Sequence, residues 1–183
     1  MKKQWLLIAA VLILLLSGCG NGNEQETSSS DHSSGSHEEM DHSGSGEVPP
    51  ELKSAANPTY KVGSQAMVQT DHMSGMKGAT GTIVGAYDTI VYAVTYTPVT
   101  GGEQVPNHKW VIHEELQAAQ AESYNPGDEV VLEADHMKGM KGAKATIDSA
   151  ERTTVYMIDY TPTNGGPKVT NHKWVTEDEL TAK

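Results

Sequence analysis

The residues of this chain best suited to chemistry are histidines and methionines in a short motif that occurs twice. The motif occupies residues 71–79 and 135–143, and its donor side chains are His72, Met73, Met76, His136, Met137 and Met140. Thioether sulfur suits Cu(I), and imidazole nitrogen suits copper in either oxidation state. One His and two Met on a tight loop therefore predict a three-ligand Cu(I) site in each copy. His108 and His172 are additional candidate ligands if their segments pass near the loops.

Packing is the alternative interpretation of this loop, and we favour it. Met73 and Met76 would then fill one end of a small barrel, because methionine adapts to irregular gaps in a core. Asp71 would cap the turn, while Gly75 and Gly78 would supply the positive φ angles that a tight loop needs.

A second group of metal-binding residue types lies in an acidic stretch nearer the N-terminus. Its members are His32, His37, Met40 and His42. A flexible segment can wrap around a soft ion even when its donors are loosely spaced, and the Met-Asp-His-Ser run at 40–43 resembles short motifs of bacterial copper-resistance proteins. The alternative is a solvated acidic linker in which His is one more polar residue.

The elements that must position these residues are duplicated as well. Asn107–Val111 returns without a gap as Asn171–Val175, and the Tyr-Thr-Pro run at 96–98 returns at 160–162. One folding unit has therefore been duplicated, and we place its two copies at 58–119 and 120–183.

Each copy has the pattern of short β-strands. Residues 66–69, 79–86 and 91–96 are β-prone and alternate in polarity, and glycine-rich turns separate them. Four or five strands in about 60 residues predict a mainly β protein with two tandem small SH3-like β-barrel domains after a disordered tether. The alternative is one continuous sandwich built from both copies.

The first residues have the pattern of a secretion signal. Lys2 and Lys3 precede the apolar run Leu6–Leu16, and the sequence Leu-Ser-Gly-Cys ends at Cys19. Bacterial lipoproteins share this box, so residues 1–18 are expected to be a signal peptide and Cys19 the lipidation site, anchoring the protein at the extracytoplasmic face of the cell membrane. An uncleaved N-terminal anchor is the alternative, but it leaves Cys19 without a role.

Composition excludes several classes of protein. Cys19 is the only cysteine, so once it is lipidated no disulfide, zinc-thiolate cluster or cysteine nucleophile can form. The net charge of −11 argues against nucleic-acid binding. Residues 19–57 are rich in Ser, Gly, Glu, Asp and His, so we predict that they form a disordered tether.

The lipobox, the acidic tether and the tandem units together resemble the YdhK family of bacterial lipoproteins. The placing of Gly63, Gly78 and the strands also resembles the KOW type of SH3-like barrel. The family resemblance implies the location and domain boundaries given above and a loose association with copper-handling genes. It implies no particular activity.

No catalytic motif is present, so we expect a protein that is not an enzyme. Ser64, Ser74 and Ser123 lie in no nucleophile motif, and the metalloprotease pattern H-E-x-x-H does not occur. The expected function is the binding or buffering of a soft metal such as copper. The alternative is a module that binds an envelope polymer or protein, with a candidate surface made of Tyr92, Tyr96, Tyr156 and Tyr160. Alternate tyrosines on a strand share one face, however, and such a face is more often part of the core than a binding surface.

Overall fold

A computed structural model describes residues 43–183 of the chain. Seven strands form one sheet: β1 (Gln65–Val68), β2 (Thr80–Tyr96), β3 (Val105–Ile112), β4 (Glu129–Val131), β5 (Lys144–Tyr160), β6 (Val169–Thr176) and β7 (Leu180–Ala182). Two single 3-10 turns, η1 (His113–Glu115) and η2 (Glu177–Glu179), follow β3 and β6. The prediction of a mainly β protein is confirmed. The signal peptide, Cys19 and the donors His32, His37, Met40 and His42 lie outside the described residues.

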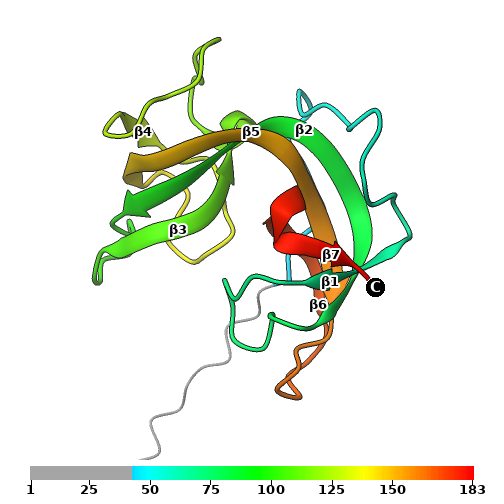
Figure 1. The fold of residues 1–183 in the computed structure, drawn as a ribbon. Coiled ribbons are helices and arrows are strands. Elements are labelled where there is room, and N and C mark those ends of the chain that lie inside the picture. The colour runs from blue at the N-terminus through cyan, green and yellow to red at the C-terminus, as the bar shows by residue number, and fades with distance from the viewer. Residues whose placement is uncertain (1–42) are drawn as a thin grey trace, which may run out of the picture. The chain divides into compact units, whose positions relative to one another are not determined.

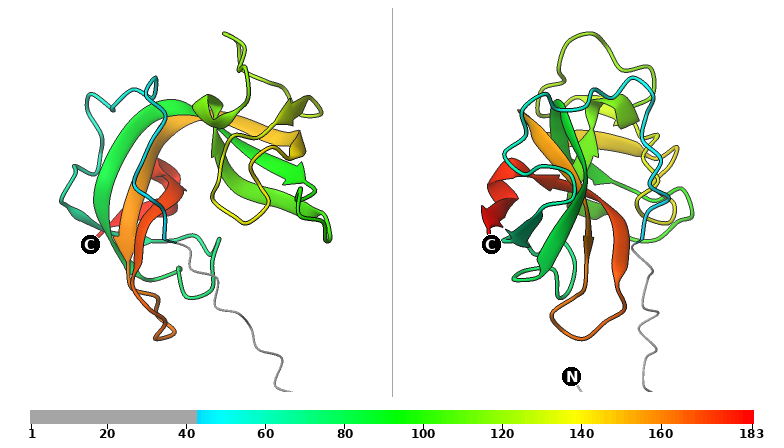
Figure 2. Two further views of the ribbon diagram at one scale, coloured as in Figure 1. Left: turned by 180° about the vertical axis from the view of Figure 1, so that it is seen from behind. Right: turned by 90° about the vertical axis from the view of Figure 1, so that its right-hand side faces the viewer.

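The two 17-residue strands β2 and β5 are the frame of the sheet. They pair antiparallel, from Gly81 opposite Tyr160 to Tyr96 opposite Ala145, and they curve together as they run side by side (Figures 1 and 2). The short strands pair with one end of this frame or the other: β1 with β2, β3 with β2, β4 with β5, and β6 with β5. The order β4-β5-β2-β1-β7 leaves the sheet open instead of closing it into a barrel.

The burial of the long strands explains why they stay extended. Successive side chains of a strand face opposite sides of the sheet, so a one-sided sheet would bury every second residue. In β2 the residues from Val91 to Val94 are all fully buried, because hydrophobic clusters cover both faces there. A continuous Val-Tyr-Ala-Val run is therefore what this position requires.

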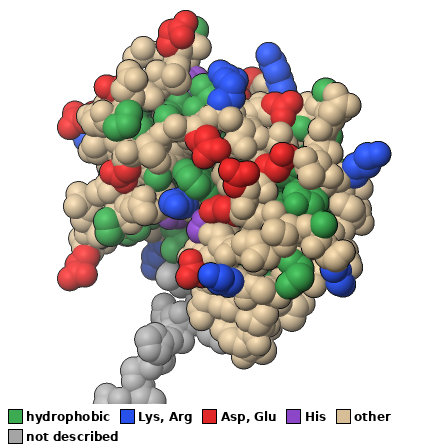
Figure 3. Space-filling view, viewed as in Figure 1, with side chains coloured by type: hydrophobic (Ala, Val, Ile, Leu, Met, Phe, Trp, Pro, Cys, Tyr) green, Lys and Arg blue, Asp and Glu red, His purple; other side chains and the backbone are tan. Residues whose placement is uncertain are grey.

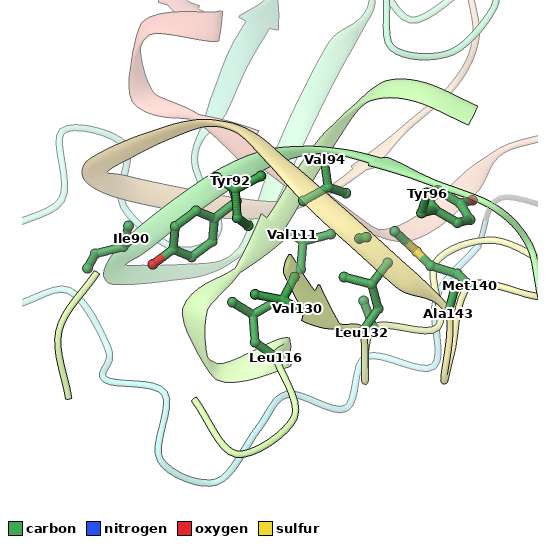
Figure 4. Close-up of a cluster of buried hydrophobic side chains, with 13 residues drawn as sticks. Ile90, Tyr92, Val94, Tyr96, Val111, Leu116, Val130, Leu132, Met140 and Ala143 are labelled. Carbon is green, nitrogen blue, oxygen red and sulfur yellow. The ribbon is translucent and has the colours of Figure 1, made fainter. Parts of the chain in front are cut away.

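Two hydrophobic cores lie at opposite ends of the β2–β5 frame, and each combines residues of both sequence repeats. The Tyr92 core joins Tyr92, Val94 and Val111 of the first copy to Leu132 and Ile147 of the second (Figure 4). In the other core, which we call the Tyr156 core, Val68, Met76 and Ile83 pack with Tyr156 and Ile158. The sequence predicts one barrel per copy, whereas in the structure each long strand passes through both cores.

The expected tether is shorter than the sequence suggests, because residues 43–57 pack on the sheet. The backbone N–H of Ala55 donates to the carbonyl of Ala86, and Ser54 forms a β-bridge with Tyr87. Leu52 is buried in a third cluster with Trp110 and Trp174. Leu52 and Val48 are among the few apolar residues of this stretch, and burying them holds it on the fold. Over residues 43–183, no helix is long and apolar enough to cross a bilayer.

Candidate functional site

One cavity of about 1130 Å³ collects six of the eight candidate donors that lie within residues 43–183. The side chains that line it include His72, Met73, His108, His136, Met137 and His172. Acidic and basic side chains lie beside histidine in a recess of this face (Figure 3). The two copies of the motif and the two Asn-His-Lys segments therefore meet at one place.

The first half of the site is organised by Glu115, a buried carboxylate at the end of η1. Its Oε1 accepts the Nε2–H of His136 at 2.8 Å. Its Oε2 accepts the indole N–H of Trp174 at 3.0 Å and the backbone N–H of Ile112 at 3.3 Å. Glu115 belongs to the first copy, while His136 and Trp174 belong to the second, so the group crosses between repeats.

The second half repeats this arrangement around Glu179, at the end of η2. Glu179 Oε1 accepts the Nε2–H of His72 at 2.7 Å, and Oε2 accepts the indole N–H of Trp110 at 2.9 Å. The backbone N–H of Thr176 donates to the same Oε2 at 3.0 Å. Each of the two crossed His–Glu–Trp groups therefore contributes one histidine, His136 or His72, to the lining of the cavity.

Local sequence explains where the two carboxylates lie. Each 3-10 turn leaves the backbone N–H of the residue before it without a helical partner, and the Glu at the third position of the turn accepts that N–H. Sequence reasoning missed Glu115 and Glu179. The signal was available, because acidic runs end at the same offset in both copies, just before Leu116 and Leu180.

Both carboxylates are ionised, although Glu115 is buried and Glu179 is partly buried. Burial alone would raise the pKa of Glu115, but the hydrogen bond and charge of His136, with the Trp174 and Ile112 N–H groups, lower it. For Glu179, burial is likewise outweighed by His72, Thr176 and Trp110, and the pKa falls to about 2. Each carboxylate therefore holds one histidine through its Nε2.

Three histidines of the site each have one buried ring nitrogen with no hydrogen-bond partner among residues 43–183. These nitrogens are the Nδ1 atoms of His72 and His136 and the Nε2 atom of His108. Burial, followed by the charges of His136 and His72, lowers the pKa of His108 to about 4, so this ring is neutral at ordinary pH. The rings of His108 and His136 lie 6.3 Å apart, and His172 packs edge-on against Tyr160 at 5.7 Å.

The four motif methionines divide into two kinds. Met76 and Met140 are fully buried, in the Tyr156 core and the Tyr92 core respectively, and they do not line the cavity. Their position matches the packing alternative. Met73 and Met137 are only partly buried and line the cavity beside the histidines.

Two further structural observations limit the chemistry of the site. Within residues 43–183, no three His, Asp or Glu side chains lie in an arrangement that could hold a metal ion, so a metal would need a methionine or a tether residue as a further ligand. The tyrosines expected as a binding surface, Tyr92, Tyr96, Tyr156 and Tyr160, are at most 2% exposed. The expectation of a tyrosine platform is wrong, because these side chains form the cores.

These features define a small open-sheet β protein, built from a duplicated unit, with a histidine-lined cavity where the two copies meet. The chain belongs to the family described as "Protein of unknown function (DUF1541)", whose model matches residues 62–113 and 126–177. The resemblance drawn from the motifs is thereby confirmed.

Related proteins share both sequence and fold. The uncharacterized protein YdhK of Bacillus subtilis (strain 168) is 61% identical over 174 residues, which cover 94% of this chain and 85% of that protein. A crystal structure of ydhK from the same species matches with a TM-score of 0.77 and 65% identity, covering 80% of this chain and all of that one. A solution structure of the ydhK C-terminal domain matches with a TM-score of 0.64 and 65% identity, over 67% of this chain and 93% of that one.

Proposed function

We propose that the protein is an extracytoplasmic lipoprotein, anchored by Cys19, that binds a soft metal such as copper and performs no catalysis. One observation carries the proposal: four histidines and two methionines from distant parts of the chain line a single cavity. Imidazole and thioether ligands are the set that selects Cu(I) over harder ions.

The surroundings of the histidines support a ligand role. Metal-binding histidines usually donate their second ring N–H to a carboxylate, which fixes the ring and makes the other nitrogen more basic. Glu115 and Glu179 stand in this relation to His136 and His72. The buried Nδ1 atoms of His72 and His136 are then available as metal ligands, and His108 adds a neutral ring beside His136.

The donors fall into two sets related by the internal repeat. His136, Met137 and His108 form the set beside the Tyr92 core, while His72, Met73 and His172 are their counterparts. Each set combines a loop of one copy with a strand of the other. A bound Cu(I) ion would therefore be shared between the two copies.

An envelope-binding module is the second candidate, and the size of the cavity favours it. A volume of about 1130 Å³ exceeds what one metal ion needs and falls near the upper end of small-molecule sites. Its lining of Glu, Asp, His and Lys would suit a polar or cationic group.

A Cu(I) titration separates these functions. Residues 19–183 carrying Cys19→Ser would compete for Cu(I) against a chromophoric chelator, beside the double variant His108→Ala/His136→Ala. The matched control is His113→Gln, because His113 is the described histidine that does not line the cavity. We expect at least a tenfold weaker Cu(I) affinity for the double variant and none of that loss for the control. Equal affinity in all three proteins, with melting temperatures unchanged, would refute the metal site.

A further inference from the structure

The two loops that carry the cavity-lining methionines are each contacted by a turn of the other copy. The turn 161–166, between β5 and β6, contacts the first loop, residues 72–76. The turn 97–102, between β2 and β3, contacts the second loop, residues 136–140. No residue of either turn lines the cavity. Each turn therefore acts on a donor loop without touching the site itself.

The first loop is fixed at both of its ends. His72 is hydrogen-bonded to the carboxylate at the end of η2, and Met76 is fully buried. The backbone N–H of Met76 donates to the carbonyl of Met73 at 3.1 Å, which closes a turn. Ser74 and Gly75 are the middle of that turn and directly follow Met73, which lines the cavity. The position of the Met73 sulfur therefore depends on what holds Ser74 and Gly75.

Thr163 and Asn164, of the turn between β5 and β6, hold these two residues. The backbone N–H and the hydroxyl of Thr163 both donate to the carbonyl of Gly75, at 2.9 and 3.1 Å. Asn164 Nδ2 donates to Ser74 Oγ at 3.2 Å. A Cβ atom on Gly75 would lie 2.7 Å from Asn164 Cγ, and the φ of Gly75 is 77°. Glycine is therefore needed here both for the backbone conformation and for the close approach of the second turn.

The second loop is held in the same manner but by fewer hydrogen bonds. The backbone N–H of Val99 donates to the carbonyl of Gly139 at 2.9 Å. A Cβ atom on Gly139 would lie 2.5 Å from Thr100 Oγ1, so the approach is equally close. Val99 has no hydroxyl, and Lys138 takes the place of Ser74. Among the described residues, the two side-chain hydrogen bonds that hold the first loop have no counterpart at the second.

We propose that Thr163 and Asn164 are positioning residues for the binding of a soft metal ion, because they fix the turn that follows Met73 and so hold its sulfur at the cavity. The proposal rests on the proposed function and adds residues that set the affinity of the same site. Neither residue contacts the ion. A ligand that is already held in its binding geometry loses less conformational freedom when the ion binds, so the affinity is higher.

Amide hydrogen exchange tests the hold on the first loop without any metal. The parent protein is residues 19–183 carrying Cys19→Ser, and the reporter is the Met76 amide, whose hydrogen bond closes the turn. Thr163→Val/Asn164→Thr gives this turn the residues of the turn between β2 and β3, and it removes both side-chain hydrogen bonds. One hydrogen bond is worth a factor of about three to ten, so the Met76 amide should exchange at least about threefold faster.

Cu(I) titration of protein labelled with ¹³C-methyl methionine tests the consequence for the site. The Met73 signal follows binding at the first loop and the Met137 signal follows binding at the second, both in competition with a chelator. In the double variant, half-saturation of Met73 should need at least about threefold more free Cu(I), while that of Met137 should not change. Thr163→Ser keeps a hydroxyl beside the Gly75 carbonyl and should keep the parent value.

Val99→Thr is the converse test at the second loop. It supplies the missing hydroxyl beside the carbonyl of Gly139, so the Met140 amide should exchange about threefold more slowly and Met137 should saturate at about threefold less free Cu(I). Damage to the fold cannot produce this gain. Thr161→Val is the matched control, because Thr161 is exposed, lies in the turn between β5 and β6 and makes no side-chain hydrogen bond to residues 43–183. It should change neither measurement.

The outcomes separate this proposal from the function on which it rests. If Met73 and Met137 of the parent do not respond to Cu(I), the proposed function fails, and this proposal fails with it. If both respond but the double variant leaves the Met76 exchange rate or the Met73 titration unchanged, only the positioning role is overturned. Equal losses at Met73 and Met137 would also overturn it, because a general loss of stability acts on both. If the double variant does not fold, Val99→Thr decides alone, and an unchanged Met137 titration there overturns the proposal.

Discussion

Glu115 and Trp174 belong to different copies of the repeat, yet the carboxylate of one accepts the indole N–H of the other at 3.0 Å. The same carboxylate holds His136, which lines the cavity. The Glu115 carboxylate therefore both joins the two copies of the repeat and positions a histidine of the cavity. The equivalent pair, Glu179 and Trp110, is less enclosed, since its carboxylate side chain is 15% exposed against 7% for Glu115.

Glu115→Ala should be among the most destabilising single substitutions. It leaves the N–H groups of Trp174, Ile112 and His136 buried without an acceptor, and breaking a buried pair of this kind costs about 3–5 kcal/mol. Urea denaturation measures the loss. Glu122→Ala, on an exposed residue, is the control and should stay within about 0.5 kcal/mol of the parent. A similar small loss for both variants would mean that the carboxylate contributes little.

Neither half of the chain should fold alone. The sequence predicts that residues 58–119 and 120–183 each form a domain, whereas the structure places residues of both in each core. Separated halves should give collapsed NMR spectra with narrow dispersion, and an equimolar mixture should recover the dispersed β spectrum. A dispersed spectrum from either half by itself would contradict the shared cores.

Met76 and Met140 should prove to be packing residues. Replacing both by Leu keeps most of the apolar volume and should cost less than about 1.5 kcal/mol per site, while Met140→Ala should cost about 2–5 kcal/mol by opening a cavity. Cu(I) affinity of the double Leu variant should equal that of the parent. If affinity falls while the melting temperature holds, the buried sulfurs are ligands after all.

Tyr156 should titrate unusually late. Burial and the hydrogen bond that its hydroxyl donates to Glu177 at 2.8 Å raise its pKa to about 12, from an ordinary value of 10. The pKa of the Tyr156 hydroxyl is higher in the folded than in the unfolded chain, so the protonated hydroxyl stabilises the fold. That stabilisation is complete below pH 10 and is lost as the pH rises towards 12. Tyrosine ring ¹³C shifts measure the titration, and Tyr156→Phe assigns the signal. An ordinary titration near pH 10 would exclude the buried hydrogen bond.

Cys19→Ser should abolish lipid attachment, because the thioether can form only at that sulfur. Mass spectrometry of protein extracted from membranes should show an acylated terminus at Cys19 in the parent and none in the variant. An unmodified Met1 terminus on the parent would disprove the lipoprotein prediction.

The alternation of apolar residues was enough to predict strands, but it could not say which strands pair. The run Val91–Val94 reads as one short strand of one copy, and nothing local shows that β2 continues to 17 residues and passes through two cores. Because both copies carry nearly the same pattern, pairing within a copy and pairing across copies satisfy the sequence equally well.

The histidines of the site could be predicted from residue type, while their partners could not. His72 and His136 stand in a repeated motif, but Glu115 and Glu179 lie among other acidic residues and are selected only by the geometry of a 3-10 turn. For Met76 and Met140, residue type alone left two roles open, and burial distinguishes them.

Because β2 and β5 each pass through both cores, a single copy of the repeat would not be sufficient to form either core. A chain with one copy of the repeat would hold half of each core and could complete it only with a second identical chain. Two such chains would form a symmetric, strand-exchanged homodimer, with the same two cores and the same crossed carboxylate–tryptophan contacts. Joining the two genes would turn that assembly into a single polypeptide whose stability no longer depends on its concentration.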